Sequence, residues 1–442
     1  MENYATKIEM RDLGSLRPYT RNPRKHSRNQ IRQLAKSFKK FGFVVPLLVT
    51  EDGEIIAGHG RFEAAKLLGV AELPVICLSH LTPDERRAYV IADNKLAQNA
   101  GWDNEVLAIE LDALSSAGLE IEVLGFSTAE IDLVFDTAAE AKTALRSPED
   151  SVPAVDATAL VSRSGDLWTM GDHILACGDA RDQSVYGNTL MGQKAALVIT
   201  DPPYNVKIDR NVAGHGSIRY REFGMASGEM NEAQFTDFLR TICERLVENS
   251  IDGSIHYIFM DWRHMRELLA AGGPVFSELK NICVWNKTNG GLGSFYRSKH
   301  ELVFVWKAGT ASHINNFGLG QHGRVRTNVW DYAGINTFRK GRMGELALHP
   351  TVKPVALVAD AIKDCSRRGD IVLDPFCGSG TILIAAEKTG RKARAVDIDP
   401  IYVDTAVKRW EAYTGKFATL FGTNDTFELI AERRKQLAPV PV

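Results

Sequence analysis

The chain has 442 residues, of which 44% are hydrophobic and 24% are charged, and its formal net charge is −2. At roughly 100–200 residues per domain this length predicts two to four domains, and the hydrophobic content excludes a disordered chain. The balanced net charge indicates no class of partner, so the distribution of charge along the chain has to be examined.

Targeting, membrane and metal signals are absent from the sequence. No apolar run follows a basic start, and the longest apolar stretches, such as residues 43–49, fall far below the roughly 18 residues of a membrane span. The six cysteines are scattered without a C-x-x-C pair, which favours a reduced cytoplasm and offers no spacing for a structural zinc ion. We therefore expect a cytoplasmic protein with no membrane segment and no bound metal.

The first module, residues 1–110, predicts an α/β domain with a basic start. Residues 13–50 contain nine Lys or Arg and no acid, which predicts salt-sensitive DNA binding. Ile31, Leu34, Ala35 and Phe38 have the spacing of an amphipathic helix. The other expected elements are strands over residues 44–50, 55–57 and 73–78, and a helix over 62–68 that follows a glycine turn at 58–61.

The next stretch, residues 111–162, predicts an acidic helical connector and linker. Residues 101–160 contain 13 acids and only two basic residues, Lys142 and Arg146. Residues 103–136 favour helix, whereas residues 137–159 are rich in Ala, Ser, Pro and acids, as linkers are. We expect this stretch to separate two independent domains.

The second module, residues 163–425, alternates strands and helices. Strands are expected at residues 196–200, 254–260, 282–286, 302–306, 371–373 and 393–396, and helices at 232–249, 265–271, 354–366 and 381–389. Such alternation predicts a doubly wound, mostly parallel sheet, in which ligands bind at the carboxyl ends of the strands. A C-terminal helix and tail, residues 426–442, are expected to follow.

One strand end carries Asp201-Pro202-Pro203-Tyr204. The two prolines fix φ and hold a rigid turn that presents a carboxylate, proline carbonyls and an exposed aromatic ring. Such a turn can offer two hydrogen-bond acceptors to an amino group and a ring to a flat base. By itself, the motif fits a stiff strand exit with a solvated carboxylate equally well.

A second strand ends at Asp374 and leads through a glycine loop into a helix. The glycines, Gly378 and Gly380, permit a tight turn and let a ligand approach the backbone at the helix N-terminus. About 20 residues further on, another strand ends at Asp397, whose carboxylate can accept hydrogen bonds from two ribose hydroxyls. This layout predicts a nucleotide or adenosyl site, and the absence of a P-loop motif disfavours a phosphate cradle.

In combination, these motifs resemble the amino-group DNA methyltransferases that use S-adenosylmethionine. Cys177-Gly178-Asp179, Trp285-Asn286-Lys287, His300-Glu301 and the run 349–354 match the family in order. The catalytic motif precedes the cofactor loop, which is the permuted order of the family's beta group. The resemblance covers residues 163–422 and implies a Rossmann-like methyltransferase sheet. Asp397 stands where the family more often has Glu.

The resemblance implies roles for individual residues. It makes Asp201, Pro202, Pro203 and Tyr204 the catalytic turn, with Tyr204 stacking on an extruded base. The residues that it implies for S-adenosylmethionine are Asp179, Thr351, Lys353, Asp374, Phe376, Gly378, Ser379, Gly380, Thr381 and Asp397. For Lys353, which would face the methionine carboxylate of the cofactor, an exposed charge at a helix start is the competing interpretation.

Residues 286–345, which carry nine Lys or Arg and three acids, lie where the family places its target-recognition segment. Cations there suit phosphates and guanine edges, and the interleaved aromatic residues suit unstacked bases. The DNA contacts expected in this segment are Lys287, Arg297, Lys299, Arg324 and Arg326.

The first module resembles the ParB N-terminal (ParB-like nuclease) domain over residues 8–100. The match rests on Gly42, Pro46, the turn Gly58-His59-Gly60-Arg61 and Pro74. The turn lies where that family contacts a nucleotide or phosphate, and Asp93-Asn94-Lys95 is a polar cluster typical of such domains when fused to methyltransferases. The resemblance favours DNA docking or regulation over nuclease activity, and leaves a bound nucleotide and a homodimer open.

We therefore expect a bacterial or phage-encoded enzyme, of the kind found in restriction–modification systems, that methylates the N6 amine of adenine at a specific site in double-stranded DNA. The nearest alternative is the N4 amine of cytosine, where Ser is common at the position of Asp201. Methylation of RNA or protein is a second alternative. A ParB-like regulatory module with a vestigial methyltransferase half is a third.

Overall fold

The computed structural model describes residues 7–99, 101–142, 148–153, 159–206, 226–287, 296–320, 324–334 and 352–436. The chain divides into two compact units, Met1–Ala144 and Leu145–Val442. Among the described residues, no helix is both long and apolar enough to cross a membrane.

The first unit contains a five-stranded sheet in the order β1-β5-β3-β4-β2. Its strands are β1 (Glu9–Asp12), β2 (Arg17–Pro18), β3 (Leu47–Val49), β4 (Glu54–Ala57) and β5 (Glu72–Cys77). Its helices are α1 (Arg28–Phe41), α2 (His59–Leu68), α3 (Pro83–Gln98), α4 (Asn104–Ser116) and α5 (Thr128–Lys142). The expected α/β character is confirmed, although α3, β1 and β2 were not expected and the strand expected at 44–50 is shorter.

Among the described residues, three separate hydrophobic clusters support the first unit, the smallest of which is formed by Ile56, Leu78 and Val90. One packs β3, β4 and β5 against α2, through residues such as Leu47, Ile55 and Phe62. Another joins α4 and α5 through Leu111, Ile131 and their neighbours. The stretch expected to be a helical connector therefore has a small core of its own.

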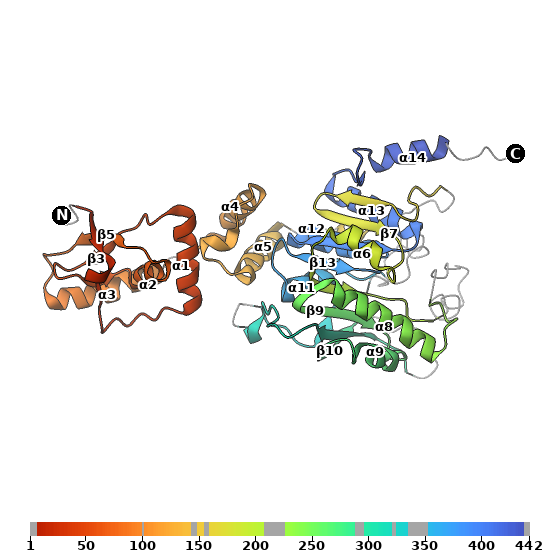
Figure 1. Ribbon diagram of the computed structural model, residues 1–442, viewed down its shortest axis with the longest axis horizontal. Helices are drawn as coiled ribbons and strands as arrows, with labels where there is room; N and C mark the ends of the chain where they lie inside the picture. Colours follow the sequence, from red (N-terminus) through yellow and green to blue (C-terminus); the bar gives the residue numbers. More distant parts are fainter. Residues whose placement is uncertain are drawn as a thin grey trace. The chain divides into compact units, whose positions relative to one another are not determined.

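Within the described residues, the second unit is built on a ten-stranded sheet in the order β12-β10-β11-β9-β8-β13-β14-β7-β6-β15. Figure 1 labels β10, β9, β13 and β7 of this sheet. The strands are β6 (Leu167–Met170), β7 (His173–Cys177), β8 (Ala195–Thr200), β9 (Ser250–Met260), β10 (Glu278–Asn286), β11 (His300–Lys307), β12 (Val329–Asp331), β13 (Ile371–Asp374), β14 (Lys392–Asp397) and β15 (Thr419–Leu420). The central run from β9 to β7 is parallel, whereas β11, β10, β6 and β15 add antiparallel pairs at the two sides.

Helices cover both faces of this sheet. They are α6 (Gln183–Leu190), α8 (Glu232–Glu248), α9 (Met265–Gly272), α11 (Val355–Cys365), α12 (Thr381–Thr389), α13 (Pro400–Thr414) and α14 (Phe427–Gln436). Because side chains alternate along a strand, Leu197 and Ile199 of β8 join the core with α11 to α13, and Val198 joins the core with α6, α8 and α9. The expected doubly wound sheet is confirmed, with antiparallel sides that the sequence did not predict.

Candidate active site

Three carboxylates lie at neighbouring strand ends. Asp201 follows β8, Asp374 ends β13 and Asp397 ends β14, and these three strands are adjacent and parallel. Their carboxyl ends therefore meet at one edge of the sheet, where ligands bind in doubly wound folds. The sequence predicted all three residues for the site, and the fold brings them together.

Both carboxylate oxygens of Asp201 accept hydrogen bonds in the protein. The Tyr204 hydroxyl donates to Oδ1, and the Lys353 ammonium donates to Oδ2. Pro202 is buried beneath the turn, while the Asp201 side chain stays 25% exposed. The turn thus holds a carboxylate at the surface of the site, with two donors already in place.

Lys353 belongs to a cluster of four charged side chains: Asp201, Glu301, Lys353 and Lys287. Lys353 Nζ lies 3.0 Å from Glu301 Oε2, and the other Glu301 oxygen binds the Lys287 ammonium. The Tyr204 hydroxyl lies 3.4 Å from Glu301 Oε2. This charge cluster contains two acids and two bases, so its formal charges balance.

Burial and pairing shift the pKa values in the charge cluster in different directions. Burial raises the pKa of Asp201, against the opposing effect of the Lys353 ammonium. Burial disfavours the charged form of Glu301, but the ammonium groups of Lys353 and Lys287 outweigh it and lower its pKa to about 2. Burial likewise opposes the charged form of Lys353, yet Asp201 and Glu301 raise its pKa. Glu301 and Lys353 are therefore ionised at neutral pH.

Asn205 fixes the end of the catalytic turn. Its φ is +54°, and its side-chain amide donates to the Met230 carbonyl at 2.8 Å. Its side-chain oxygen accepts from the backbone N–H groups of Gly228 at 3.0 Å and Met230 at 3.2 Å. Asn205 therefore ties the segment before α8 to the turn and has no contact with the charge cluster.

The glycine loop after β13 supports Asp374 and Asp397 from the backbone. Asp374 accepts from Thr200 Oγ1 at 2.8 Å and from the Phe376 N–H at 3.1 Å. The Gly378 N–H donates to Asp397 Oδ2 at 2.8 Å. Gly378 has φ +53° and open space around its Cα, so the backbone can approach a ligand closely.

Asp374 and Asp397 are buried carboxylates at the same edge of the sheet. Burial raises the pKa of each to about 7. Among the described residues, no Lys, Arg or His forms a salt bridge with either carboxylate. A positively charged ligand at this edge would therefore compensate charges that the protein leaves without a basic partner.

Ser379 and Thr381, which were expected at the cofactor, contact another side chain of the protein. Their hydroxyls lie 3.2 and 3.1 Å from the buried Arg409 guanidinium, and Thr381 also donates to the Lys353 carbonyl.

The remaining residues expected at the cofactor have separate surroundings. Asp179 pairs with Arg181 at 2.7 Å. Phe376 packs against Phe238, with ring centroids 6.3 Å apart. Thr351 lies outside the described residues. Lys353 is neither an exposed helix-start charge nor isolated, because it lies in the charge cluster.

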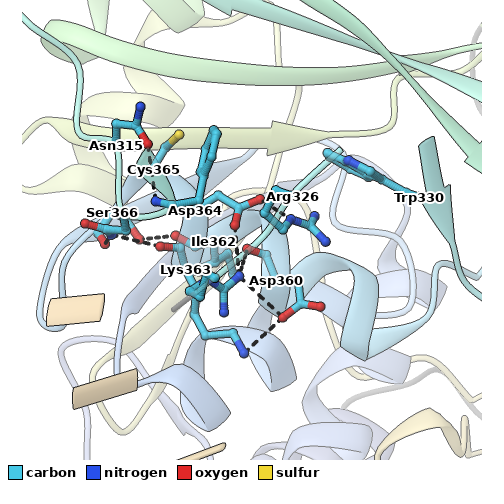
Figure 2. Close-up of polar contacts among 12 residues, drawn as sticks. Asn315, Arg326, Trp330, Asp360, Ile362, Lys363, Asp364, Cys365 and Ser366 are labelled. Carbon is cyan, nitrogen blue, oxygen red and sulfur yellow. Dashed lines mark hydrogen bonds and ion pairs between the residues drawn. The ribbon is translucent and has the colours of Figure 1, made fainter. Parts of the chain in front are cut away.

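The expected DNA contacts divide into two groups. Arg297 and Lys299 are exposed before β11. Arg324 and Arg326 instead bind the buried Asp364 on α11, each at 2.8 Å, and Figure 2 shows Arg326 directed at this carboxylate. The expectation that these two arginines reach DNA is corrected, because burying Asp364 requires their positive charges. Lys287 is likewise engaged, by Glu301.

Sequence reasoning assigned no role to Glu301 or Arg409. Glu301 is the second residue of β11 and directly precedes the apolar run 302–306, and an acid beside such a run is a signal for a buried partner. Arg409 gives no comparable signal, because it lies in a helix with several charged residues.

The glycine turn of the first unit, residues 58–61, also contains a charged side chain, Arg61. Gly58 has φ +101°, and the Arg61 guanidinium donates to the Val45 carbonyl at 3.2 Å. His59 Nε2 accepts from the Tyr19 N–H at 3.2 Å, and burial lowers the pKa of His59 to about 4. The imidazole is therefore neutral at pH 7, and Arg61 carries the positive charge of the turn.

Three protein-family models match the chain. A ParB N-terminal domain matches residues 2–94, a ParB-methyltransferase HTH domain matches residues 105–164, and a DNA methylase matches residues 195–408. The HTH match falls on α4 and α5, in the stretch expected to be an acidic connector. The methylase match spans the strand ends that carry Asp201, Asp374 and Asp397.

Individual proteins resemble separate parts of the chain. The DNA adenine methyltransferase YhdJ of Escherichia coli K12 is 40% identical over 241 residues, covering 48% of this chain and 75% of that protein. The ParB-like nuclease domain-containing protein YnaK of the same organism is 49% identical over 81 residues, covering 18% of this chain and 93% of that protein. The solved structure of the cytosine-N4-specific PvuII DNA methyltransferase is 15% identical, with a TM-score of 0.41, and covers 61% of this chain and 93% of that one.

Proposed function

The chain belongs to the DNA methylase family of N6-adenine and N4-cytosine methyltransferases, and from this premise we propose that it methylates the N6 amine of adenine in double-stranded DNA. The observation that carries the proposal is Asp201, a carboxylate on a rigid proline turn beside Asp374 and Asp397. This arrangement joins an acceptor for an amine to a site for a cationic, hydroxyl-bearing cofactor.

S-Adenosylmethionine supplies a methyl group already activated on a positively charged sulfonium, which becomes a neutral thioether on transfer. Asp397 would accept hydrogen bonds from the ribose hydroxyls of the cofactor, and the Asp374 carboxylate would compensate positive charge on it. Gly378 and Gly380 would let the backbone lie close to the cofactor, and Phe376 of the same loop would help to hold it. Ser379 and Thr381 act through Arg409, which holds the loop.

The target amine is a weak nucleophile because its lone pair is delocalised into the base. Asp201 and the Pro202 carbonyl accept hydrogen bonds from the amine, which localises the lone pair on nitrogen. The nitrogen becomes positively charged as its bond to the methyl carbon forms and the carbon–sulfur bond breaks, with the electron pair staying on sulfur. Asp201 then accepts the proton that the nitrogen loses.

The amine cannot be reached inside a duplex, so the base is extruded from the stack. Tyr204 stacks on the extruded base and, in doing so, withdraws its hydroxyl from Asp201. Pro203 keeps the turn rigid during this exchange. Arg297 and Lys299 contact the DNA near the site, because both side chains are exposed.

The N-terminal domain, residues 1–110, supplies a second contact with DNA in this proposal. Five exposed basic residues of α1 are positioned to follow phosphates: Arg28, Arg32, Lys36, Lys39 and Lys40. The turn that carries Arg61 offers a positive charge and backbone N–H groups to a nucleotide. Residues 163–425 then form the catalytic domain.

The choice of adenine rests on Asp201, where Ser is common in cytosine enzymes, and on the adenine methyltransferase YhdJ among the relatives. The test incubates the purified chain with methyl-labelled S-adenosylmethionine and unmethylated DNA, and then identifies the labelled nucleoside. Label in N6-methyladenine is the expected result. Label in N4-methylcytosine would overturn the base assignment, and DNA binding without any label would favour a regulatory module.

A further inference from the structure

Glu301 lies behind the catalytic turn and is more buried than Asp201. Its side chain is 14% exposed, compared with 25% for Asp201, and its two oxygens bind Lys353 and Lys287. The Tyr204 hydroxyl lies 3.4 Å from its Oε2. Glu301 therefore contacts Lys353 and Tyr204, the two groups that donate to Asp201, and its charge also repels the charged form of Asp201 and raises its pKa.

Lys353 cannot disperse its charge into water. Its side chain is 8% exposed, and its ammonium lies 4.9 Å from the centre of the Phe259 ring and 5.7 Å from that of the Trp285 ring. A buried ammonium has to be compensated by carboxylates. Asp201 and Glu301 share this task, so each carboxylate that is removed leaves more of the positive charge uncompensated.

Positive charge at this position opposes methyl transfer from a sulfonium. The cofactor is cationic at sulfur, and the amine becomes cationic as the methyl group arrives, so both are disfavoured by a nearby ammonium. With Glu301 ionised, the charge cluster is neutral in total. Without it, Asp201 would be the single carboxylate of the charge cluster, beside the Lys353 ammonium, and the cluster would carry a net positive charge.

We propose that Glu301 is a positioning residue that neutralises Lys353, so that the charge of Asp201 remains available to the cationic reaction centre. This role rests on the proposed function, to which it adds Glu301 as a residue that supports Asp201. It also explains why a glutamate occurs next to the apolar run of β11. Removing the charge of Glu301 should therefore weaken the binding of a cationic ligand and leave the binding of a neutral ligand unchanged.

S-Adenosylmethionine and S-adenosylhomocysteine separate these cases, because they differ by the methyl group and by the positive charge on sulfur. The test measures the Kd of both ligands by calorimetry for the wild-type chain, Glu301→Gln and Lys287→Met. In Glu301→Gln the Kd of S-adenosylmethionine should rise roughly tenfold, while that of S-adenosylhomocysteine changes by less than about twofold. Lys287→Met leaves the cluster with an extra negative charge, so the ratio of the two Kd values should shift in the opposite direction.

Two matched variants complete the experiment. Glu301→Asp keeps the charge and should keep the Kd ratio near that of the wild type, and Glu244→Gln removes an exposed charge of α8 and should change neither Kd. Equal weakening of both ligands in Glu301→Gln, or an unchanged ratio in both cluster variants, would overturn the proposal. A wild-type chain that binds neither ligand would instead contradict the proposed function.

Discussion

At the scale of single residues, Tyr204 and Lys353 occupy the two oxygens that the target amine would need. Lys353 is buried and held by two carboxylates, whereas Tyr204 belongs to the same turn as Asp201 and is only partly buried. Tyr204 is therefore the partner that has to leave when a base enters. Its hydroxyl and its ring then have separate roles, which substitutions can distinguish.

Tyr204→Phe removes the hydroxyl that donates to Asp201 and keeps the ring that stacks on the base. We expect its kcat/KM for DNA methylation to stay within about fivefold of the wild type, and Tyr204→Ala to lose about a hundredfold, because base stacking is worth about 1–3 kcal/mol per base. Steady-state methylation of a duplex containing the target site measures both. A hundredfold loss in Tyr204→Phe would show that the hydroxyl itself is required.

If Asp397 holds the ribose, as proposed, cofactor affinity should depend on pH. Burial raises the pKa of Asp397 to about 7, so this carboxylate is increasingly protonated below pH 7 and loses its capacity to accept hydrogen bonds from hydroxyls. We expect the Kd of S-adenosylmethionine to rise as the pH is lowered from 8 to 6, by at most about tenfold per pH unit per proton. Titration calorimetry across this range measures the slope.

Asp397→Asn is the control for this pH dependence. The variant should bind more weakly at pH 8 and should show a flatter slope, with the remainder due to Asp374, whose pKa burial also raises to about 7. A slope equal to that of the wild type would mean that Asp397 does not titrate in this range.

At the scale of elements, α11 and α12 hold the two segments that carry Lys353 and the glycine loop. Lys353 lies two residues before α11, and the Gly378–Gly380 turn leads into α12. The far end of α11 is held by Asp364, which binds Arg324 and Arg326 of the segment before β12. Figure 2 shows Arg326 beside Asp364. The geometry of the site therefore depends on both helices keeping their positions.

Asp364→Asn should strongly destabilise the second unit. The Asp364 side chain is 3% exposed, and its loss leaves the Arg324 and Arg326 charges without the carboxylate that they share. We expect a loss of about 3 kcal/mol in the free energy of unfolding, measured by urea denaturation. Asp237→Asn, which breaks an exposed pair with Arg240, should cost less than about 1 kcal/mol. Equal effects would contradict the role assigned to Asp364.

Gly380→Ala tests the close approach of α12 and α13. Gly380 has φ +83°, and a Cβ there would lie 2.8 Å from the Ala406 Cβ, so both strain and overlap oppose the substitution. We expect a loss of roughly 2–4 kcal/mol in stability together with weaker cofactor binding. Gly415→Ala has a similar φ of +70° in open space and should cost only about 1 kcal/mol, with unchanged cofactor binding.

At the scale of the whole molecule, a net charge of −2 conceals an uneven distribution. The exposed basic residues of α1 belong to the acid-free stretch 13–50 in the first unit, whereas Asp201, Asp374 and Asp397 belong to the second unit. The proposed function assigns a DNA contact to the first unit and methyl transfer to the second, so the two activities should respond differently to substitution.

The double variant Arg32→Ala/Lys36→Ala should reduce the salt dependence of DNA binding. Each phosphate contact that is lost lowers the slope of log K against log salt concentration by about 0.9, so the expected change is roughly 1.8. Fluorescence anisotropy on a duplex at several salt concentrations measures it, and methyl transfer at saturating DNA should persist. An unchanged slope would exclude α1 from the DNA contact.

The sequence predicted those parts of the fold and site that depend on local patterns. The strands before Asp201 and Asp374 are short buried apolar runs, the strand before Asp397 is mostly small and apolar apart from Lys392 and Arg394, and their parallel order follows from the alternation with helices. By contrast, β6 was not predicted, because the polar Thr169 interrupts its apolar residues.

The partners of Lys353 could not be predicted, because they depend on long-range packing. Asp201 is 152 residues away in the sequence, and Lys353 contacts it only because β8 and the start of α11 meet in the fold. The same holds for Arg324 and Arg326, whose basic character suggested DNA until their buried partner Asp364 was located. Charge type is visible in a sequence, but charge compensation is a property of the folded chain.

The most direct test of the account is methyl transfer by Asp201→Asn, because asparagine keeps the size of the side chain and removes the negative charge. The measurement follows labelled methyl incorporation into DNA in a single turnover, together with the Kd of S-adenosylmethionine for the same variant. We predict a loss of at least about a hundredfold in the transfer rate at saturating S-adenosylmethionine, together with a rise in its Kd of about tenfold, as for Glu301→Gln, because the Lys353 ammonium loses a carboxylate in both variants. A variant that still methylates DNA at the wild-type rate would contradict this prediction.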